Sequence, residues 1–167
     1  MNCIPRSDYY LNEILPTQAG WRALAQQAAP VLAEIAGIVD RFTPSENERQ
    51  TEDNLVVPVL RALGHTVEVQ APLKTPDGTK VPDYIFYRDD AALAAHKNQV
   101  LTEAVAIEGA FAVGDAKYWN RPLDIAVRTK GADALSNKNP SYQIYFYMLH
   151  SGVEWGILTN GKPCSAR

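Results

Sequence analysis

The sequence predicts a mixed α/β domain, with a central mixed β-sheet flanked by helices and an extra helix at the N-terminus. Residues 17–40 repeat apolar side chains at helical spacing, and several later segments alternate or concentrate β-branched and aromatic residues, as strands do. The resulting order, α-α-β-β-α-β-α-β, is typical of helices packed on a mixed sheet. A chain of 167 residues makes one domain with a small appendage. We expect residues 1–45 to form a helical extension and residues 46–167 to form the main domain.

The composition is that of a folded domain outside the membrane. Hydrophobic residues make up 46% of the chain, and no apolar run approaches the ~18 residues of a membrane span. Cys3 and Cys164 are too few for a disulfide framework, so we expect free thiols in a reducing cytoplasm. The net charge of −3 argues mildly against a stand-alone, high-affinity nucleic-acid-binding protein, because such affinity comes mostly from neutralised phosphates. This net charge is compatible with a site in which acidic residues bind a metal ion.

Two helices are expected before the first strand. The helix at residues 17–40 is amphipathic, and Pro30 should bend it. The second helix should begin after Ser45, a plausible N-cap residue, and end before Gly64. Pro58 lies in the middle of this second helix, where it should bend the helix or mark where it truly begins.

The rest of the chain predicts four strands and two helices. The strands are expected at residues 65–73, 81–88, 110–119 and 153–158, with turns at residues 74–80 and 159–162. The helices are expected at residues 89–108 and 141–150. Residues 120–140 are expected to be mostly loop.

The strand at residues 110–119 carries two opposite charges on one face. Residues two apart in a strand share a face, so Asp115 and Lys117 follow Phe111 and Val113 on the same side. Burying a charge is costly unless it is paired or binds a metal. The triplet is therefore either the point where a strand leaves the core for water or part of a site.

Two further carboxylates are candidates for the same site. Asp83 opens the apolar strand that follows Pro82, where it is either a polar strand start or a group that faces Asp115 across neighbouring strands. Glu52 lies at the edge of the apolar stripe of the second helix, where it either stabilises the first turn or lines the site. Asp77, by contrast, is explained by the turn in which it lies.

Gln143 and Tyr147 lie four residues apart on the expected helix at residues 141–150, so they share one helix face. A glutamine amide and a tyrosine hydroxyl can both reach a phosphate oxygen. Aromatic helices more often belong to the core, so this pair alone does not define a site.

Taken together, these motifs resemble the PD-(D/E)xK nuclease superfamily. The segments "VPDYIFY" and "GDAKYW" are similar to its two half-motifs, and Gln143 and Tyr147 are similar to the QxxxY helix of one branch. "TEDNLVVPVLRALGH" resembles the glutamate-bearing helix that precedes the core there. The closest likeness is to the N-terminal nuclease domains of fused (type IIG) restriction–modification enzymes and of type I restriction subunits, over about residues 46–163.

The resemblance implies a restriction-endonuclease-like core and metal-dependent hydrolysis of DNA phosphodiesters. It implies Mg²⁺ as the cofactor, with Mn²⁺ able to substitute, bound by Asp83, Asp115, Glu52 and the carbonyl of Ala116. Lys117 would steady developing negative charge, and Gln143 and Tyr147 would position the DNA backbone or a water. The candidate DNA contacts are Lys80, Tyr118, Lys130 and Lys138.

The resemblance also implies partners and leaves alternatives open. The 167 residues contain no methyltransferase or target-recognition segment, so such a domain would act in trans or lie outside this chain, and homodimerisation is open. One alternative is a catalytically silent module of the same fold that binds DNA or protein. Another is an assembly or regulatory subunit whose carboxylates are ordinary surface groups.

Overall fold

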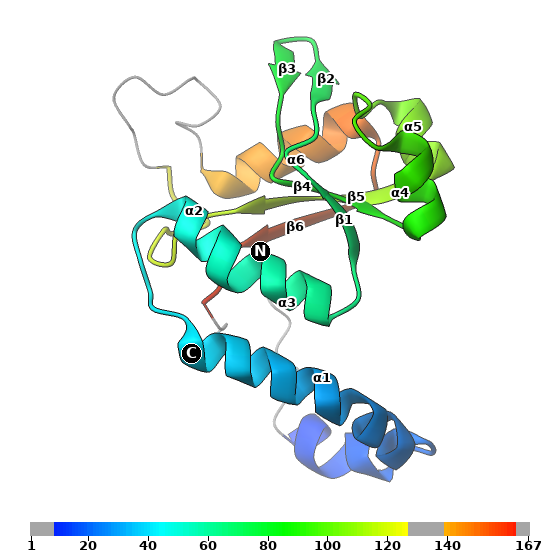
Figure 1. Cartoon of the computed structure of the whole chain (residues 1–167), viewed down its shortest axis with the longest axis vertical. Coiled ribbons are helices and arrows are strands. Elements are labelled where there is room, and N and C mark those ends of the chain that lie inside the picture. The colour runs from blue at the N-terminus through cyan, green and yellow to red at the C-terminus, as the bar shows by residue number, and fades with distance from the viewer. Residues whose placement is uncertain (1–8, 127–138, 163–167) are drawn as a thin grey trace.

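The computed structural model describes residues 9–126 and 139–162, and its centre is a four-stranded sheet (Figure 1). The strands are β1 (Thr66–Val69), β4 (Tyr84–Tyr87), β5 (Ala110–Ala116) and β6 (Trp155–Thr159), in the order β1-β4-β5-β6. β4 pairs antiparallel with both β1 and β5, whereas β5 and β6 run parallel. The mixed sheet flanked by helices that the sequence predicts is therefore confirmed.

Helices cover both faces of the sheet. One face is covered by the almost continuous segment of α2 (Glu48–Thr51), the π-helical turn η3 (Glu52–Val56) and α3 (Val57–Ala62). From this segment Val56 and Leu60 pack against Tyr84, Phe86 and Ala112. A β-carbon at Gly114 would lie only 2.9 Å from the ring of Phe86. The missing side chain thus allows the close packing of β5 beside β4.

The opposite face is covered mainly by α6 (Pro140–Ser151), with α4 (Asp90–His96) and α5 (Glu103–Glu108) beside it. Ile144 and Tyr147 of α6 belong to the same buried cluster as Ile85 and Val113 of the sheet. The expected helix at residues 141–150 is confirmed, and Asn139 caps it by accepting a hydrogen bond from the Tyr142 amide. The sheet is thus the middle of three layers.

The N-terminal part lies outside these layers. A π-helical turn, η1 (Tyr10–Ile14), and a 3₁₀ turn, η2 (Leu15–Thr17), precede the long helix α1 (Trp21–Arg41). Figure 1 shows α1 extending below the sheet, with its C-terminal end beside α3. Pro30 lies inside α1, as the sequence predicts.

Three local expectations need correction. Asn47, not Ser45, caps the second helix, because its side chain accepts the Gln50 amide while Ser45 Oγ accepts the Asn47 amide. The strand expected at residues 65–73 ends at Val69, because Gln70 takes a left-handed backbone conformation (φ 56°). The chain then forms a separate hairpin of β2 (Leu73–Thr75) and β3 (Gly78–Lys80), which the sequence does not predict beyond its turn.

The helix expected at residues 89–108 is wrong as a single element. It breaks into α4 and α5 at Asn98, whose φ is 63°. The amide of Asn98 donates a 2.7 Å hydrogen bond to Glu68 Oε1. Leu101 then bridges to Leu73 as a short extended segment. A contact thirty residues away in the chain therefore holds this break.

The end of the second helix agrees with the sequence. Gly64 has a φ of 74°, and the amide of His65 bonds to the carbonyl of Leu60, which closes the helix. No helix among residues 9–126 and 139–162 combines the length and apolar character needed to cross a bilayer.

Candidate functional site

Two carboxyls from neighbouring strands meet at one end of the sheet. In the β4–β5 register Tyr84 pairs with Gly114, so Asp83, just before β4, faces the end of β5. Asp83 Oδ2 accepts a 2.7 Å hydrogen bond from the Ala116 amide. Burial, and then the negative charge of Asp83, raise the pKa of Asp115, which is only 2% exposed. The antiparallel register thus brings together two acids that are 32 residues apart in the chain.

Lys117 supplies the positive charge next to these acids. Its Nζ lies 2.6 Å from Asp115 Oδ2, and its side chain is 12% exposed. Apart from this ion pair, that buried oxygen has no hydrogen-bond partner among the described residues. Burial disfavours the charged form of Lys117, but Asp115, Glu48 and Asp83 outweigh it and raise the pKa of the ammonium. Lys117 is therefore protonated at neutral pH and acts here as a cation, not as a base.

Glu52 reaches the same region from the helical side. It is 6% exposed, and its Oε2 accepts a hydrogen bond from the Tyr84 hydroxyl at 3.4 Å. Burial, followed by the negative charges of Asp83 and Glu48, raises the pKa of Glu52 to about 7. A carboxyl buried beside other acids is costly to ionise, so this site holds its protons to an unusually high pH.

A π-helical turn carries Glu52 into this position. The Val57 amide bonds to the carbonyl of Glu52, five residues back, instead of to the residue four back. Pro58 follows in the first turn of α3, where the missing amide hydrogen costs nothing. In an unbroken α-helix the ring of Pro58 would clash with the carbonyl of Asn54. Pro58 thus marks the true beginning of a helix, which was one of its two predicted roles.

Glu48 is a member of the site that the sequence reasoning missed. Its Oε1 lies 3.8 Å from Lys117 Nζ, and its carboxylate accepts a hydrogen bond from the backbone amide of Tyr118. Burial raises the pKa of Glu48, against the lowering effect of Lys117. The available signal was its spacing, because residues four apart such as Glu48 and Glu52 share one side of a helix.

Arg121 is a second residue that the sequence reasoning missed. It is 7% exposed, and its guanidinium donates to the carbonyl of Ile125 at 3.2 Å. Its positive charge lowers the pKa of Glu48. Asn160, after β6, donates to the Arg121 carbonyl and so ties this segment to the sheet. No pattern in the loop sequence distinguishes Arg121 from a surface arginine.

The acid cluster, defined here as Glu48, Glu52, Asp83 and Asp115, therefore brings more negative than positive charge to this region, and three of its members, Asp115, Glu48 and Asp83, act on Lys117. Burial raises the pKa of Asp115 to about 7, with Lys117 opposing the shift and Asp83 adding to it. Carboxylate oxygens are the ligands that Mg²⁺ prefers, and one or two carboxylates commonly suffice because the ion keeps several waters. Within the described ranges, no three acidic, histidine or cysteine side chains are gathered around one point. The pair Asp83 and Asp115 fits such an ion best, because among the described residues Asp115 Oδ2 has the Lys117 ammonium as its one partner.

Gln143 and Tyr147 lie on α6, on the face of the sheet that Val113 shares. They bond to each other, with Gln143 Nε2 donating to the Tyr147 hydroxyl at 2.9 Å. Tyr147 is buried in the core. The role of Gln143 and Tyr147 at the site stays a prediction.

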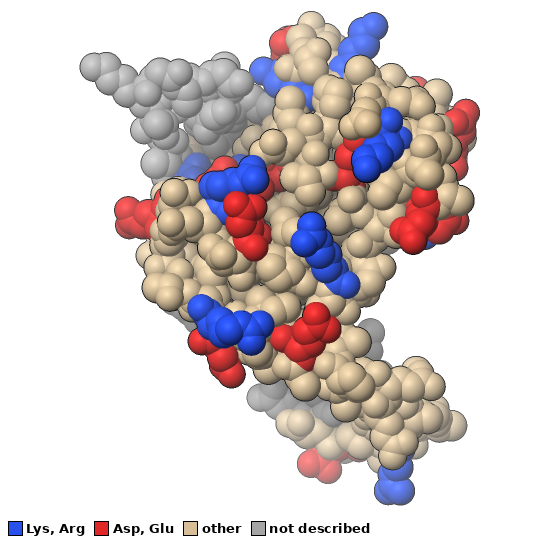
Figure 2. All heavy atoms as spheres, viewed as in Figure 1, with Lys and Arg blue, Asp and Glu red and all other residues tan. Residues whose placement is uncertain are grey.

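Two of the four candidate DNA contacts, Lys80 and Tyr118, lie in the described part of the chain. Lys80 ends the β2–β3 hairpin, and Tyr118 follows Lys117 and offers its backbone amide to Glu48. Lys130 and Lys138 lie outside the described residues. On the face drawn in Figure 2, basic and acidic side chains are interspersed and do not form one continuous basic stripe.

Comparisons of the chain with protein-family models, with curated proteins and with solved structures found no match.

Proposed function

We propose that this chain is a metal-dependent DNA endonuclease with a restriction-endonuclease-like core of the PD-(D/E)xK type. One observation carries the proposal: the half-buried Asp83, which accepts a hydrogen bond from the Ala116 amide, lies at the same end of the sheet as the buried Asp115, which is paired with the ammonium of Lys117. Buried charges that are left poorly satisfied are characteristic of sites that bind or react. We place such a nuclease in a restriction–modification or mobile-element defence system in the cytoplasm, as the resemblance implies.

Each residue has a role that its surroundings support. Asp83 and Asp115 would hold Mg²⁺ or Mn²⁺ together with the carbonyl of Ala116, and the carboxylate of Glu52 would hold a metal-bound water or a second ion. The ion would supply Lewis-acid polarisation of the phosphodiester. Lys117, protonated at neutral pH, stabilises negative charge that develops on the phosphate oxygens. Glu48 keeps this ammonium in place from the helical side.

The DNA has to be brought to this site with little help from net charge. The chain carries −3, so tight binding calls for a specificity or methyltransferase partner, or for a second copy of the chain. Gln143 and Tyr147 are proposed to position the DNA backbone, and Lys80, Tyr118, Lys130 and Lys138 to contact it. These assignments rest on the resemblance of the motifs.

The test is incubation of the protein with supercoiled and linear DNA in Mg²⁺ or Mn²⁺. We expect cleavage that requires the ion and is lost in Lys117→Ala. Lys97→Ala is the matched control, because Lys97 is exposed at the end of α4, and it should cleave normally. Binding of Mn²⁺ without cleavage of any DNA form would favour the catalytically silent binding module. Absence of both would overturn the proposal.

A further inference from the structure

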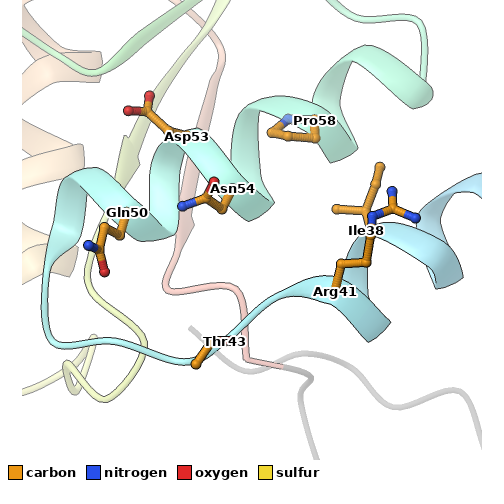
Figure 3. Close-up of a pocket in the computed structure, with 7 residues that line it drawn as sticks. All are labelled: Ile38, Arg41, Thr43, Gln50, Asp53, Asn54 and Pro58. Atoms are coloured by element: carbon orange, nitrogen blue, oxygen red, sulfur yellow. The ribbon is translucent and has the colours of Figure 1, made fainter.

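A cavity of about 520 Å³ lies between α1 and the helical segment that carries the acid cluster (Figure 3). Its lining comes from the end of α1, the linker that follows and the outer side of α2, η3 and α3. The residues that matter for its chemistry are Ile38, Arg41, Thr43, Gln50, Asn54 and Pro58. The volume falls within the range of ~300–1,000 Å³ that is typical of small-molecule sites.

This cavity is separate from the acid cluster, although one helical segment serves both. Glu48 contacts Lys117 and Glu52 contacts the Tyr84 hydroxyl. Gln50 and Asn54 instead project on the side that faces α1 and the linker (Figure 3). Residues four apart share a helix side, so each pair forms a polar row of its own. Gln50 and Asn54 are therefore not members of the acid cluster.

The charge in the cavity comes from Arg41. Its guanidinium has no carboxylate partner in the described part of the chain, whereas the other charged lining residue, Asp53, is paired with Arg49 at 2.8 Å. Figure 3 also shows the carboxylate of Asp53 pointing away from α1. The cavity therefore offers one unneutralised guanidinium, which is suited to an anionic group.

The remaining lining has both polar and apolar parts. Gln50 and Asn54 present side-chain amides, each of which can donate and accept at the same time. Ile38 is buried at the base, and Pro58 adds a second apolar surface. A ligand that satisfies all of these groups combines an anion, a flat face and an edge with both donors and acceptors.

We propose that this cavity is a nucleotide-binding site that favours adenine. A nucleotide carries a phosphate for Arg41, a flat base for the apolar surfaces of Ile38 and Pro58, and a base edge for the amides. Asn and Gln side chains form paired hydrogen bonds with the N6 and N7 atoms of adenine, which pyrimidines cannot match. A divalent cation is a poor fit because Arg41 repels it, and a purely apolar ligand would leave the amides unsatisfied.

The same chemistry can come from a free nucleotide or from an unpaired nucleotide of a DNA strand. Isothermal titration with adenosine 5′-monophosphate, adenosine, inorganic phosphate and a short single-stranded oligodeoxyadenylate distinguishes these sources. The titrations are made in EDTA, so the result does not depend on the proposed nuclease activity. Lys117→Ala, which disables the proposed catalytic site, should bind these ligands as the wild type does.

If the natural ligand is a free nucleotide, we expect adenosine 5′-monophosphate to bind more tightly than adenosine or phosphate alone. If it is an unpaired nucleotide of a DNA strand, we expect the oligodeoxyadenylate to bind more tightly than adenosine or phosphate alone. Arg41→Ala and Asn54→Ala should each weaken that binding by about 5- to 100-fold, which corresponds to the loss of one good contact. Arg22→Ala is the matched control, because Arg22 is exposed at the other end of α1. The proposal is overturned if neither nucleotide form binds, if phosphate binds equally well, or if binding survives in both cavity variants.

Discussion

Two buried carboxylate regions of this molecule differ in how well their charges are satisfied. Glu68, on β1, is 9% exposed and accepts hydrogen bonds from the Tyr87 hydroxyl at 3.1 Å and the Asn98 amide at 2.7 Å. In the acid cluster, the carboxyls of Asp115, Glu48 and Asp83 interact with the single ammonium of Lys117, and that ammonium is the one partner that Asp115 Oδ2 has in the described part of the chain.

The difference separates a structural acid from a candidate functional one. Each oxygen of Glu68 has its own donor, and together they fix the left-handed turn at Asn98 that ends α4. The acids of the cluster repel one another and hold protons, as the raised pKa values of Asp115 and Glu52 indicate. A cation bound in the cluster would reduce this repulsion between carboxylates. Glu68 would gain nothing from a cation, because each of its oxygens already accepts a hydrogen bond.

The largest effect should come from removing one charge of the acid cluster. Asp115→Asn should lower metal-dependent DNA cleavage by about a hundredfold or more, because it takes away a ligand oxygen and the partner of Lys117. Cleavage rates and Mn²⁺ calorimetry measure the effect. Asp77→Asn, in the exposed turn of the β2–β3 hairpin, is the control and should change neither. Full cleavage by Asp115→Asn would remove this carboxylate from any catalytic role.

Neutral replacements at the two glutamates should have opposite effects on stability. Glu68→Gln leaves an amide nitrogen facing one of two donors, so it should lower the free energy of unfolding by about 1–3 kcal/mol. Glu52→Gln keeps an acceptor for the Tyr84 hydroxyl and removes a charge that burial disfavours. Its melting temperature at pH 8 should equal or exceed that of the wild type.

Urea denaturation of the three proteins side by side measures this contrast. If Glu52→Gln loses as much stability as Glu68→Gln, the acid cluster is an ordinary structural network and the comparison fails. The measurement requires EDTA, because a bound ion would stabilise the wild type alone.

The raised pKa values in the acid cluster should also make the free energy of unfolding depend on pH, with an effect smaller than those of the substitutions above. The pKa values of Asp115 and Glu52 are raised to about 7, so between about pH 4 and pH 7 the folded state binds more protons than the unfolded state. The free energy of unfolding without metal should therefore fall as the pH rises through that window, and level off above it.

Melting temperatures at pH 5 and pH 8, with and without Mg²⁺, check this expectation. Mg²⁺ should raise the melting temperature at pH 8, where the carboxylates are ionised, and have little effect at pH 5. The slope between pH 5 and pH 7 should become shallower in Asp115→Asn. An unchanged slope in that variant would assign the pH dependence to other groups.

Much of the fold and three of the four acids of the cluster, Glu52, Asp83 and Asp115, could be predicted from the sequence, because they depend on local patterns. Gly64 ends its helix as expected, and α6 follows its capping residue Asn139. Asp83 and Asp115 each flank an apolar strand, so pairing of those strands alone brings them together.

What the sequence does not predict depends on contacts between distant residues. The break after α4 requires Glu68 to bond with Asn98, and the side chain of Arg121 is buried only because the chain around Ile125 and Asn160 folds over it. From the sequence alone, Glu48 is explained as an acid that stabilises the first turn of a helix. Its contact with Lys117 is visible only in the structure. The four-residue spacing of Glu48 and Glu52 shows that they share a helix side, but it does not show that Glu48 pairs with Lys117.

The smallest effect concerns the π-helical turn that positions Glu52. Pro58→Ala restores an amide hydrogen that can bond to the carbonyl of Asn54, and so favours an ordinary α-helical turn. Because Val56 and Leu60 stay anchored in the core, the change should rotate the preceding turn and move Glu52 away from Tyr84. We expect kcat for DNA cleavage to fall several-fold while KM and the melting temperature change little. Pro30→Ala, inside α1, is the control, because it alters a helical proline far from the acid cluster. Equal kcat values for the wild type and Pro58→Ala would mean that the π-helical turn is a packing adjustment, and that Glu52 reaches the cluster without it.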